Sequence, residues 1–216
     1  MSTHTLKFYY SPGSCALASH IALEETGALF EPVRVALATG EQNTPEYRKI
    51  NPKGRVPALA VDDWIVTENP AIMRFIAHAY PDAKLWPQDL RAEARCAEWL
   101  AFMSCTVHPA YAHIRRAERY ATGDSAIENV KEKGRETCRE IWTMIDQKLA
   151  KDPWAVGEHF SVADGYLQVF WNWGRGQVLG YDMEKEFPNW TAHARRVTAR
   201  PAVQRAFARE ELPLPA

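Results

Sequence analysis

The distribution of strand and helix patterns constrains the fold of this chain more than any other feature. Short β-branched and aromatic runs alternate with helical patterns up to about residue 80, and helical patterns dominate after it. A Pro-punctuated segment at 80–87 (YPDAKLWP) separates the two regions. We therefore expect two domains in the 216-residue chain, over residues 1–81 and 88–216.

The first region reads as a βαβ unit followed by a ββα unit. Strands are predicted at 5–10, 31–37, 57–61 and 64–67, and helices at 15–26 and 70–79. Gly27 is a natural end for the first helix, and Pro70 stands near the start of the second, where a missing N–H costs least. The βαβ unit favours parallel pairing with a right-handed crossover.

The second region is predicted to be all helical. Helices are expected at about 89–118, 125–150, 161–177 and 189–199, with a last short one after Pro201. Ser161 and Asp164 form a capping-box pattern with Asp in place of Glu, a folding device worth about 1 kcal/mol rather than a sign of chemistry. The chain as a whole is thus predicted to be α+β and mostly α.

Charge and composition exclude several classes of function. Lys and Arg number 26 against 27 Asp and Glu, so the chain lacks the basic excess typical of nucleic-acid binding. No apolar run approaches the roughly 20 residues needed to span a bilayer, and the first ten residues lack the layout of a secretory signal. We expect a cytoplasmic protein with neither a nucleic-acid partner nor a membrane partner.

The four cysteines are Cys15, Cys96, Cys105 and Cys138. They form neither a CxxC pair nor a Cys/His cluster with zinc spacing, so we expect no metal site and no disulfide framework. Free thiols agree with a reducing compartment.

Cys15 is the first candidate for chemistry. It follows the first predicted strand and a Ser11-Pro12-Gly13 turn, and falls in the first turn of the predicted helix. Unpaired N–H groups and the helix dipole stabilise an anion there, which favours a thiolate. The alternative is a small buried hydrophobe, a common role of free Cys, but the preceding turn favours a functional role.

Val56 and Pro57 are the second candidate, at the entry to a predicted strand. If the bond between them is cis, the Val56 backbone would present its N–H and C=O to an extended peptide ligand. From the residues alone a trans bond at a loop exit is favoured, because roughly one X–Pro bond in twenty is cis.

Two further features are ambiguous by themselves. Glu68 and Asn69 precede a predicted helix, whose N–H groups can bind a carboxylate while Glu68 takes an ammonium group; the alternative is simple capping. Ala101, Cys105 and His108 share one face of the long helix. His108 could donate a hydrogen bond to a ligand or lie in the seam between the domains.

Five segments, taken in order, carry a resemblance to a known family. They are KFYYSPGSCALASHIALEETG, INPKGRVPAL, TENPAIMRFIA, EWLAFMSCTVHPAY and FSVADGYL. Together they resemble the bacterial beta-class glutathione transferases over nearly the whole chain. The resemblance implies a thioredoxin-like N-terminal domain, an all-helical C-terminal domain, and a cytosolic homodimer with a role in detoxification. It also implies glutathione as a co-substrate, with no metal or permanently bound cofactor.

The resemblance also implies roles for single residues. Cys15 matches the class cysteine near the glutathione sulfur, and His108 matches the class histidine that reaches the site from the helical domain. Val56 matches the residue before the family's cis-proline, which is Pro57 in this chain. In the family, the main chain at the position of Val56 pairs with the cysteinyl part of glutathione. The family holds the γ-glutamyl end at the positions of Glu68 and Asn69.

Three residues depart from the class pattern. Ala101 stands where an Asn is common, Cys105 where a Ser is common, and Pro109 where a Lys is common. We expect Arg55 to supply the missing cation for the glycyl carboxylate. Ala101 and Pro109 also favour the alternative function, a non-catalytic module that binds glutathione, hydrophobic ligands or other proteins.

The predicted function is conjugation of glutathione to small hydrophobic electrophiles. Tyr10, Tyr111 and Trp173 are expected to line the electrophile pocket, and Tyr10 or Ser14 is the alternative sulfur-activating hydroxyl. Because the site holds a cysteine, thiol–disulfide exchange at Cys15 is a second enzymatic possibility.

Overall fold

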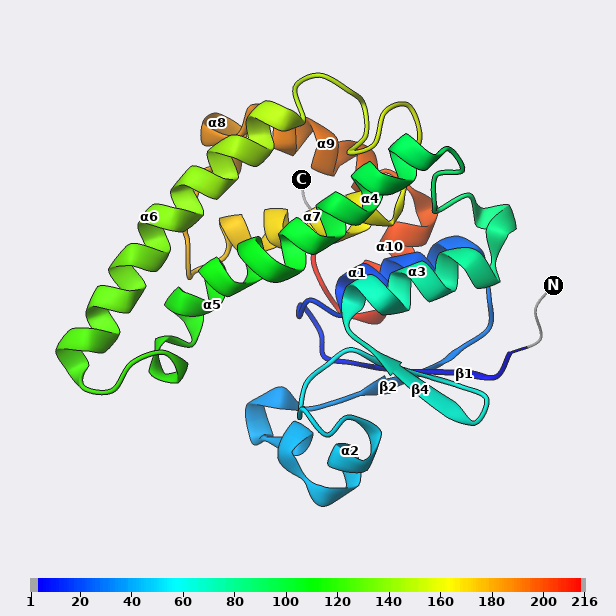
Figure 1. The fold of residues 1–216 in the computed structure, drawn as a ribbon, viewed down its shortest axis with the longest axis horizontal. Helices are drawn as coiled ribbons and strands as arrows, with labels where there is room; N and C mark the ends of the chain where they lie inside the picture. Colours follow the sequence, from blue (N-terminus) through cyan, green and yellow to red (C-terminus); the bar gives the residue numbers. More distant parts are fainter. Residues whose placement is uncertain (1–3, 215–216) are drawn as a thin grey trace.

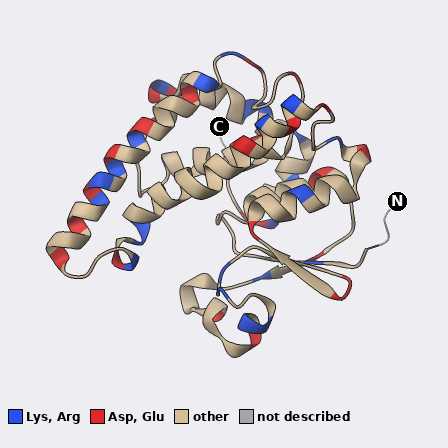
Figure 2. Cartoon of the chain, viewed as in Figure 1, with Lys and Arg blue, Asp and Glu red and all other residues tan. Residues whose placement is uncertain are grey.

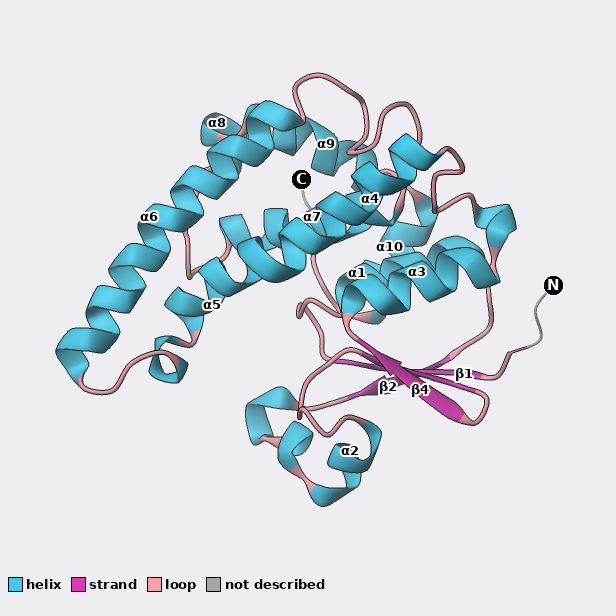
Figure 3. Ribbon diagram, in the orientation of Figure 1, coloured by secondary structure: helices cyan, strands magenta, loops and turns pink. Residues whose placement is uncertain are grey.

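A four-stranded mixed sheet lies beside a larger group of helices (Figure 1). The structure is a computed structural model that describes residues 4–214. Every strand belongs to the first third of the chain, and the remainder is helical (Figure 3). This is the predicted α+β, mostly α architecture, with a thioredoxin-like N-terminal part and a helical C-terminal part.

The sheet has the strand order β2-β1-β3-β4. Its strands are β1 (Leu6–Tyr10), β2 (Glu31–Arg34), β3 (Ala58–Val61) and β4 (Trp64–Thr67). β1 pairs in parallel with β2 and antiparallel with β3, so Phe8 stands between Pro32 and Leu59. Leu6, Phe8 and Tyr10 alternate into the core, as the period of a strand requires.

Helices cover both faces of the sheet. They are α1 (Leu17–Thr26), α2 (Pro45–Ile50) and α3 (Asn69–Ala79), with 3₁₀ turns at Leu37–Thr39, Glu41–Asn43 and Pro81–Ala83. α1 and α3 lie together on one face, and α2 lies beyond the other (Figure 1). The sequence patterns missed α2, which is too short to show a period; the Thr44 hydroxyl caps it and Pro45 opens it.

The helix predicted at 15–26 begins two residues later in the structure than the sequence pattern indicates. α1 begins at Leu17, so Cys15 lies in the turn before it. Gly27 ends the helix in a left-handed conformation at φ 67°, as expected. The predicted strand at 31–37 stops at Arg34, after which the chain turns into 3₁₀ helices.

The C-terminal part contains seven α-helices within the described residues. They are α4 (Leu90–Phe102), α5 (His108–Arg115), α6 (Asp124–Lys148), α7 (Val162–Arg175), α8 (Met183–Glu186), α9 (Pro188–Thr198) and α10 (Pro201–Arg209), with a 3₁₀ turn at Ala117–Arg119. Figure 2 shows Lys and Arg interleaved with Asp and Glu along α6, the solvated face expected of an outer helix.

The single helix predicted at 89–118 is wrong in one respect. A π turn, Met103–Val107, separates α4 from α5, and the His108 N–H reaches back to the Met103 carbonyl. Pro109 has no N–H to bond the Cys105 carbonyl, so the α-helical ladder cannot continue through this turn. Such turns occur often at functional sites.

α7 is the central helix of the molecule. It packs against α1 on one side and α4 and α9 on the other, and the capping box predicted at Ser161 and Asp164 is present at its start. Gly165 permits the close approach to α1, because a Cβ there would lie 3.1 Å from Ile21 Cγ2. No helix in the described part of the chain has the length and apolar character to cross a membrane.

Candidate active site

A cleft of about 170 Å³ lies between the sheet domain and helices α5 and α7. Its walls gather most of the candidate residues from both parts of the chain: Cys15, Arg55, Val56, Pro57, Glu68, Asn69 and His108. Ser104, Arg119, Tyr120 and Tyr166 complete the helical wall, and the sequence patterns had not singled these out. Tyr166 falls inside the FSVADGYL segment, which was the only signal available for it.

Cys15 lies at the floor of the cleft with its thiol protonated. Burial raises the pKa of Cys15 to about 12, and a hydrogen bond with Asn69 opposes this shift. The thiol donates to the Val56 carbonyl oxygen at 3.7 Å. The expected thiolate is therefore wrong for the free protein, because α1 starts beyond Cys15 and desolvation exceeds any help from the helix.

The turn that carries Cys15 is hydrogen-bonded internally. The Ser14 hydroxyl donates to the Ser11 carbonyl at 2.7 Å and accepts from the Ala16 N–H at 3.2 Å. The single O–H donor of this hydroxyl is thus used within the turn. Ser14 is not free to activate a sulfur in the cleft.

The Val56-Pro57 peptide bond is cis, so the trans bond favoured from the residues alone is wrong. Val56 precedes β3, which starts at Ala58, and its N–H has no hydrogen-bond partner among the described residues. Its carbonyl faces Cys15. A short stretch of main chain is therefore available to an extended peptide.

Glu68 and Asn69 differ in what they do. Glu68, at φ 74°, precedes α3 and pairs its carboxylate with Lys53 Nζ at 2.5 Å. Asn69 is buried: its amide donates to the Cys15 carbonyl oxygen at 2.9 Å and accepts from the Ser19 hydroxyl at 2.6 Å. Asn69 thus links α3 to the Cys15 turn, and Lys53 is a cation that the sequence patterns missed.

His108 is the first residue of α5 and lines the same cleft as Cys15. Burial and, to a smaller extent, the positive charges of Arg55 and Arg119 lower the pKa of His108 to about 4, against the opposing charge of Glu68. The imidazole is therefore neutral near pH 7 and can donate one N–H. Arg55 and Arg119 form no ion pair with any residue of the described chain, and they make this end of the cleft positive.

The three residues that were expected to line the electrophile pocket do not lie together in the structure. Tyr10 lies in the core, 7% exposed and 5.1 Å from the His20 ring, so it reaches neither the cleft nor a bound sulfur. Tyr111 stacks on Trp173 with ring centroids 4.5 Å apart, and Trp173 meets the His108 ring at 5.1 Å. Trp173 also lines a second pocket of about 220 Å³ beside Gly13.

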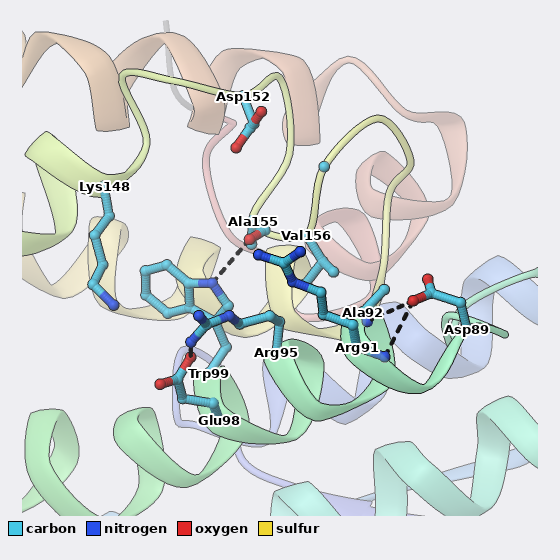
Figure 4. Close-up of a pocket in the computed structure, with 11 residues that line it drawn as sticks. Asp89, Arg91, Ala92, Arg95, Glu98, Trp99, Lys148, Asp152, Ala155 and Val156 are labelled. Carbon is cyan, nitrogen blue, oxygen red and sulfur yellow. Dashed lines mark hydrogen bonds and ion pairs between the residues drawn. The ribbon is translucent and has the colours of Figure 1, made fainter.

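A larger cavity lies elsewhere, between α4 and the loop after α6 (Figure 4). It has a volume of about 620 Å³, but its charged groups are partly paired with each other, as in the 2.8 Å contact of Arg95 with Glu98. The Trp99 indole at its base donates to the Ala155 carbonyl oxygen at 2.9 Å. It contains no cysteine or histidine among the described residues, so the smaller cleft is the candidate active site.

Within residues 4–214, no cluster of three or more His, Cys, Asp or Glu side chains is arranged to hold a metal ion.

A thioredoxin-like sheet joined to a helical domain, with a cysteine of the sheet domain beside a cis-proline in the cleft between them, defines a class of thiol-binding proteins. Two family models match the chain, the glutathione S-transferase N-terminal domain over residues 4–78 and its C-terminal domain over residues 101–201. The chain belongs to the glutathione S-transferase family.

Individual relatives agree with this assignment. GstA, a glutathione S-transferase of Escherichia coli O157:H7, is 31% identical over 210 residues, which cover 96% of this chain and all of that protein. A glutathione transferase homologue from Sulfitobacter, solved with bound glutathione, is 36% identical with a TM-score of 0.90, over 98% of this chain and all of that one. A beta-class enzyme of Sphingomonas chungbukensis is 37% identical with a TM-score of 0.83, over 96% of this chain and all of that one. The predicted resemblance is confirmed.

Proposed function

We propose that this transferase conjugates reduced glutathione to small hydrophobic electrophiles. The observation that carries the proposal is the main chain of Val56 beside a cis-proline: its N–H has no partner among the described residues, and its carbonyl oxygen accepts from the Cys15 thiol. The Sulfitobacter homologue with the same fold was solved with glutathione bound. An extended peptide that pairs with Val56 brings its own cysteine to the floor of the cleft.

The charges of the cleft suit the two ends of glutathione. The γ-glutamyl carboxylate can accept N–H groups at the start of α3, and Glu68 can take the ammonium group. Arg55 is the candidate partner for the glycyl carboxylate, with Arg119 as a second cation nearby. Glutathione would then compete with Lys53 for the Glu68 carboxylate, which this lysine occupies in the free protein.

Binding also redirects the Cys15 thiol. In the free protein this thiol donates to the Val56 carbonyl, the acceptor that the glutathione main chain would need. Once glutathione takes that carbonyl, the Cys15 S–H is free to donate to the glutathione sulfur. The neutral imidazole of His108 can add a second N–H. Both donors favour the glutathione thiolate over its thiol and so lower its pKa.

The bound thiolate then attacks the electrophile, which is held close and aligned. A sulfur–carbon bond forms, the bond from carbon to the leaving group breaks, and the thiol proton goes to solvent. The stacked rings of Tyr111 and Trp173 beside His108 are the candidate wall for the electrophile. Conjugation is favoured over thiol–disulfide exchange because exchange requires a Cys15 thiolate, which burial opposes.

The chain is further proposed to act as a homodimer in the cytoplasm. Trp64 and Ile65 on the edge strand β4 are 45% and 37% exposed, an apolar surface that a second copy would cover. Light scattering coupled to size exclusion tests the dimer.

The function is tested by two assays on matched variants. Wild type, Cys15→Ala and the exposed-thiol control Cys105→Ala are compared in conjugation of 1-chloro-2,4-dinitrobenzene and in reduction of a glutathione mixed disulfide. We expect Cys15→Ala to lose exchange and to keep part of its conjugation, because His108 remains. Absence of glutathione binding by calorimetry at millimolar ligand would refute the proposal.

A further inference from the structure

Tyr166 contributes a buried hydroxyl to the wall of the cleft. The residue lies one turn into α7, is 1% exposed and lines the same cleft as Cys15 and His108. Its hydroxyl donates no hydrogen bond within the described part of the chain, whereas the hydroxyl of Tyr47 donates to the Arg55 carbonyl oxygen at 2.8 Å. A buried O–H without an acceptor is destabilising. A ligand in the cleft would supply the acceptor that this proton needs.

Asn69 sets the direction of the Tyr166 proton. One N–H of the Asn69 amide donates to the Cys15 carbonyl oxygen at 2.9 Å, and the amide oxygen accepts from the Ser19 hydroxyl at 2.6 Å. Hydrogen bonds with the same amide also oppose the rise in pKa that burial causes at the Cys15 thiol and at the Tyr166 hydroxyl. A hydrogen bond lowers the pKa of an acid when the acid accepts it. The Tyr166 oxygen thus accepts from Asn69, and its own O–H is left to point into the cleft.

The Tyr166 hydroxyl and the Cys15 sulfur are close to each other. Both neighbour the Asn69 amide, and the charge of a Cys15 thiolate would raise the pKa of Tyr166 more than any other charge does. The Val56 carbonyl oxygen lies 3.7 Å from the Cys15 sulfur. A glutathione molecule that pairs with Val56 therefore places its own sulfur beside both groups.

The packing around Tyr166 keeps its hydroxyl fixed and protonated. The ring centroid of Tyr166 lies 5.2 Å from that of Phe170, one turn further along α7, and the Phe170 ring lies 6.0 Å from the His108 ring. Burial raises the pKa of Tyr166, and the nearby acids Cys15, Glu68 and Cys105 raise it further. The hydroxyl therefore keeps its proton at neutral pH and can donate it to an anion in the cleft.

We propose that Tyr166 is a further catalytic residue, whose hydroxyl donates a hydrogen bond to the sulfur of bound glutathione. The inference rests on the proposed function, because it needs glutathione in the cleft. Cys15, His108 and Tyr166 then supply three donors from three different segments of the chain. A thiolate accepts such bonds more strongly than a thiol does, so Tyr166 lowers the pKa of the glutathione thiol. The thiol proton goes to solvent, and Tyr166 keeps its own.

The experiment removes the hydroxyl and keeps the ring. Tyr166→Phe preserves the contact with Phe170 but has no O–H. Tyr181→Phe is the matched control, because Tyr181 also packs among aromatic rings, 5.4 Å from Phe187 and 6.1 Å from Trp142, and lies outside the cleft. Circular dichroism and urea unfolding establish that both variants are folded before they are compared.

Ultraviolet absorbance of the thiolate follows the ionisation of bound glutathione as the pH is raised. At pH values below the thiol pKa, we expect about tenfold less thiolate in Tyr166→Phe than in wild type or Tyr181→Phe, because one charge-assisted hydrogen bond is lost. The kcat of conjugation should fall by a similar factor and recover at high pH, where the thiol ionises without help. The Kd for S-methylglutathione should not change, since its sulfur cannot ionise.

Two results would overturn the inference. One is a thiolate titration of Tyr166→Phe that coincides with that of wild type. The other is an equal loss of affinity for glutathione and S-methylglutathione, which would make the hydroxyl structural. Calorimetry on wild type separates the two proposals. A wild type that binds no glutathione refutes the proposed function and this inference together, whereas bound glutathione with an unchanged titration in Tyr166→Phe refutes the role of Tyr166 alone.

Discussion

The side-chain amide of Asn69 donates a hydrogen bond of 2.9 Å to the carbonyl oxygen of Cys15. This bond joins the start of α3 to the turn before α1, and Ser19 completes it by donating to the other end of the same amide. The thiol is thereby held through its own main chain. The chemistry of the cleft depends on how such bonds place and bury Cys15.

The order in which the cysteines react is the first prediction. Exposed Cys105 should be alkylated before Cys15, because a pKa of about 12 leaves Cys15 with roughly a thousandth of the thiolate of an ordinary thiol near neutral pH. Buried Cys96 and Cys138 should react only on unfolding. Peptide mapping after timed iodoacetamide labelling measures this order. Replacing Cys105 by Ser should remove the fast phase, and a fast phase that persists on Cys15 would contradict the burial argument.

A second prediction concerns acid and His108. Its pKa is about 4 in the folded protein against 6.5 in the unfolded chain, so the unfolded state takes up the proton first. The resulting stability is present above pH 6.5 and is lost as the pH falls toward 4. Between about pH 7 and pH 5, wild type should lose about 2 kcal/mol more free energy of unfolding than His108→Gln. Urea titrations at each pH provide the two curves. Parallel curves would show that His108 titrates normally.

Glu68 should recognise the ammonium group of glutathione. Glu68→Gln removes the charge and keeps the shape, and the Kd for glutathione should rise about tenfold. Glu31→Gln is the matched control. Glu31 also pairs with a lysine, Lys7, at 3.0 Å, but it lies on β2 and outside the cleft. Calorimetry should show the loss for glutathione and little change for an analogue without the α-amino group. Equal losses for both ligands would assign Glu68 a structural role instead.

Two helix caps, at the starts of α7 and α4, should contribute very different amounts to the free energy of unfolding. Asp164 is fully buried and accepts from the Ser161 N–H at 2.8 Å and the Ala155 N–H at 2.7 Å, and it lies 2.7 Å from His193 Nε2. Asp164→Ala should cost about 3 to 5 kcal/mol, because it leaves several buried groups unpaired. Asp89 is the exposed N-cap of α4, and Asp89→Ala should lower the free energy of unfolding by only about 1 kcal/mol. Urea unfolding compares the two, and similar losses would mean that burial adds nothing to the Asp164 cap.

The order of the elements was predictable because it depends on neighbours along the chain. The alternation of Leu6, Phe8 and Tyr10, the left-handed Gly27 and the Ser161 capping box each involve residues only a few positions apart. Periodicity and caps therefore identified the strands and most of the helices, whereas the family was indicated by the resemblance of five sequence segments. Helix α2 was missed because six residues show no period.

The peptide conformation and the protonation states in the cleft were decided by tertiary packing. The cis bond at Val56, the protonated thiol of Cys15 and the neutral ring of His108 depend on which surfaces exclude water and which backbone groups meet. Tyr10 was expected to line the electrophile pocket, but the pleat of β1 turns it into the core.

By itself, the sequence determined that this protein has a sheet domain followed by helices, with Cys15 close after the Ser11-Pro12-Gly13 turn that ends the first strand. Only the tertiary structure decides that Gly13 is bonded to Trp173 and Glu210, which are 160 and 197 residues away. The physical reason is that local propensity acts over a few residues, whereas desolvation and long-range hydrogen bonds exist only once distant segments have packed together.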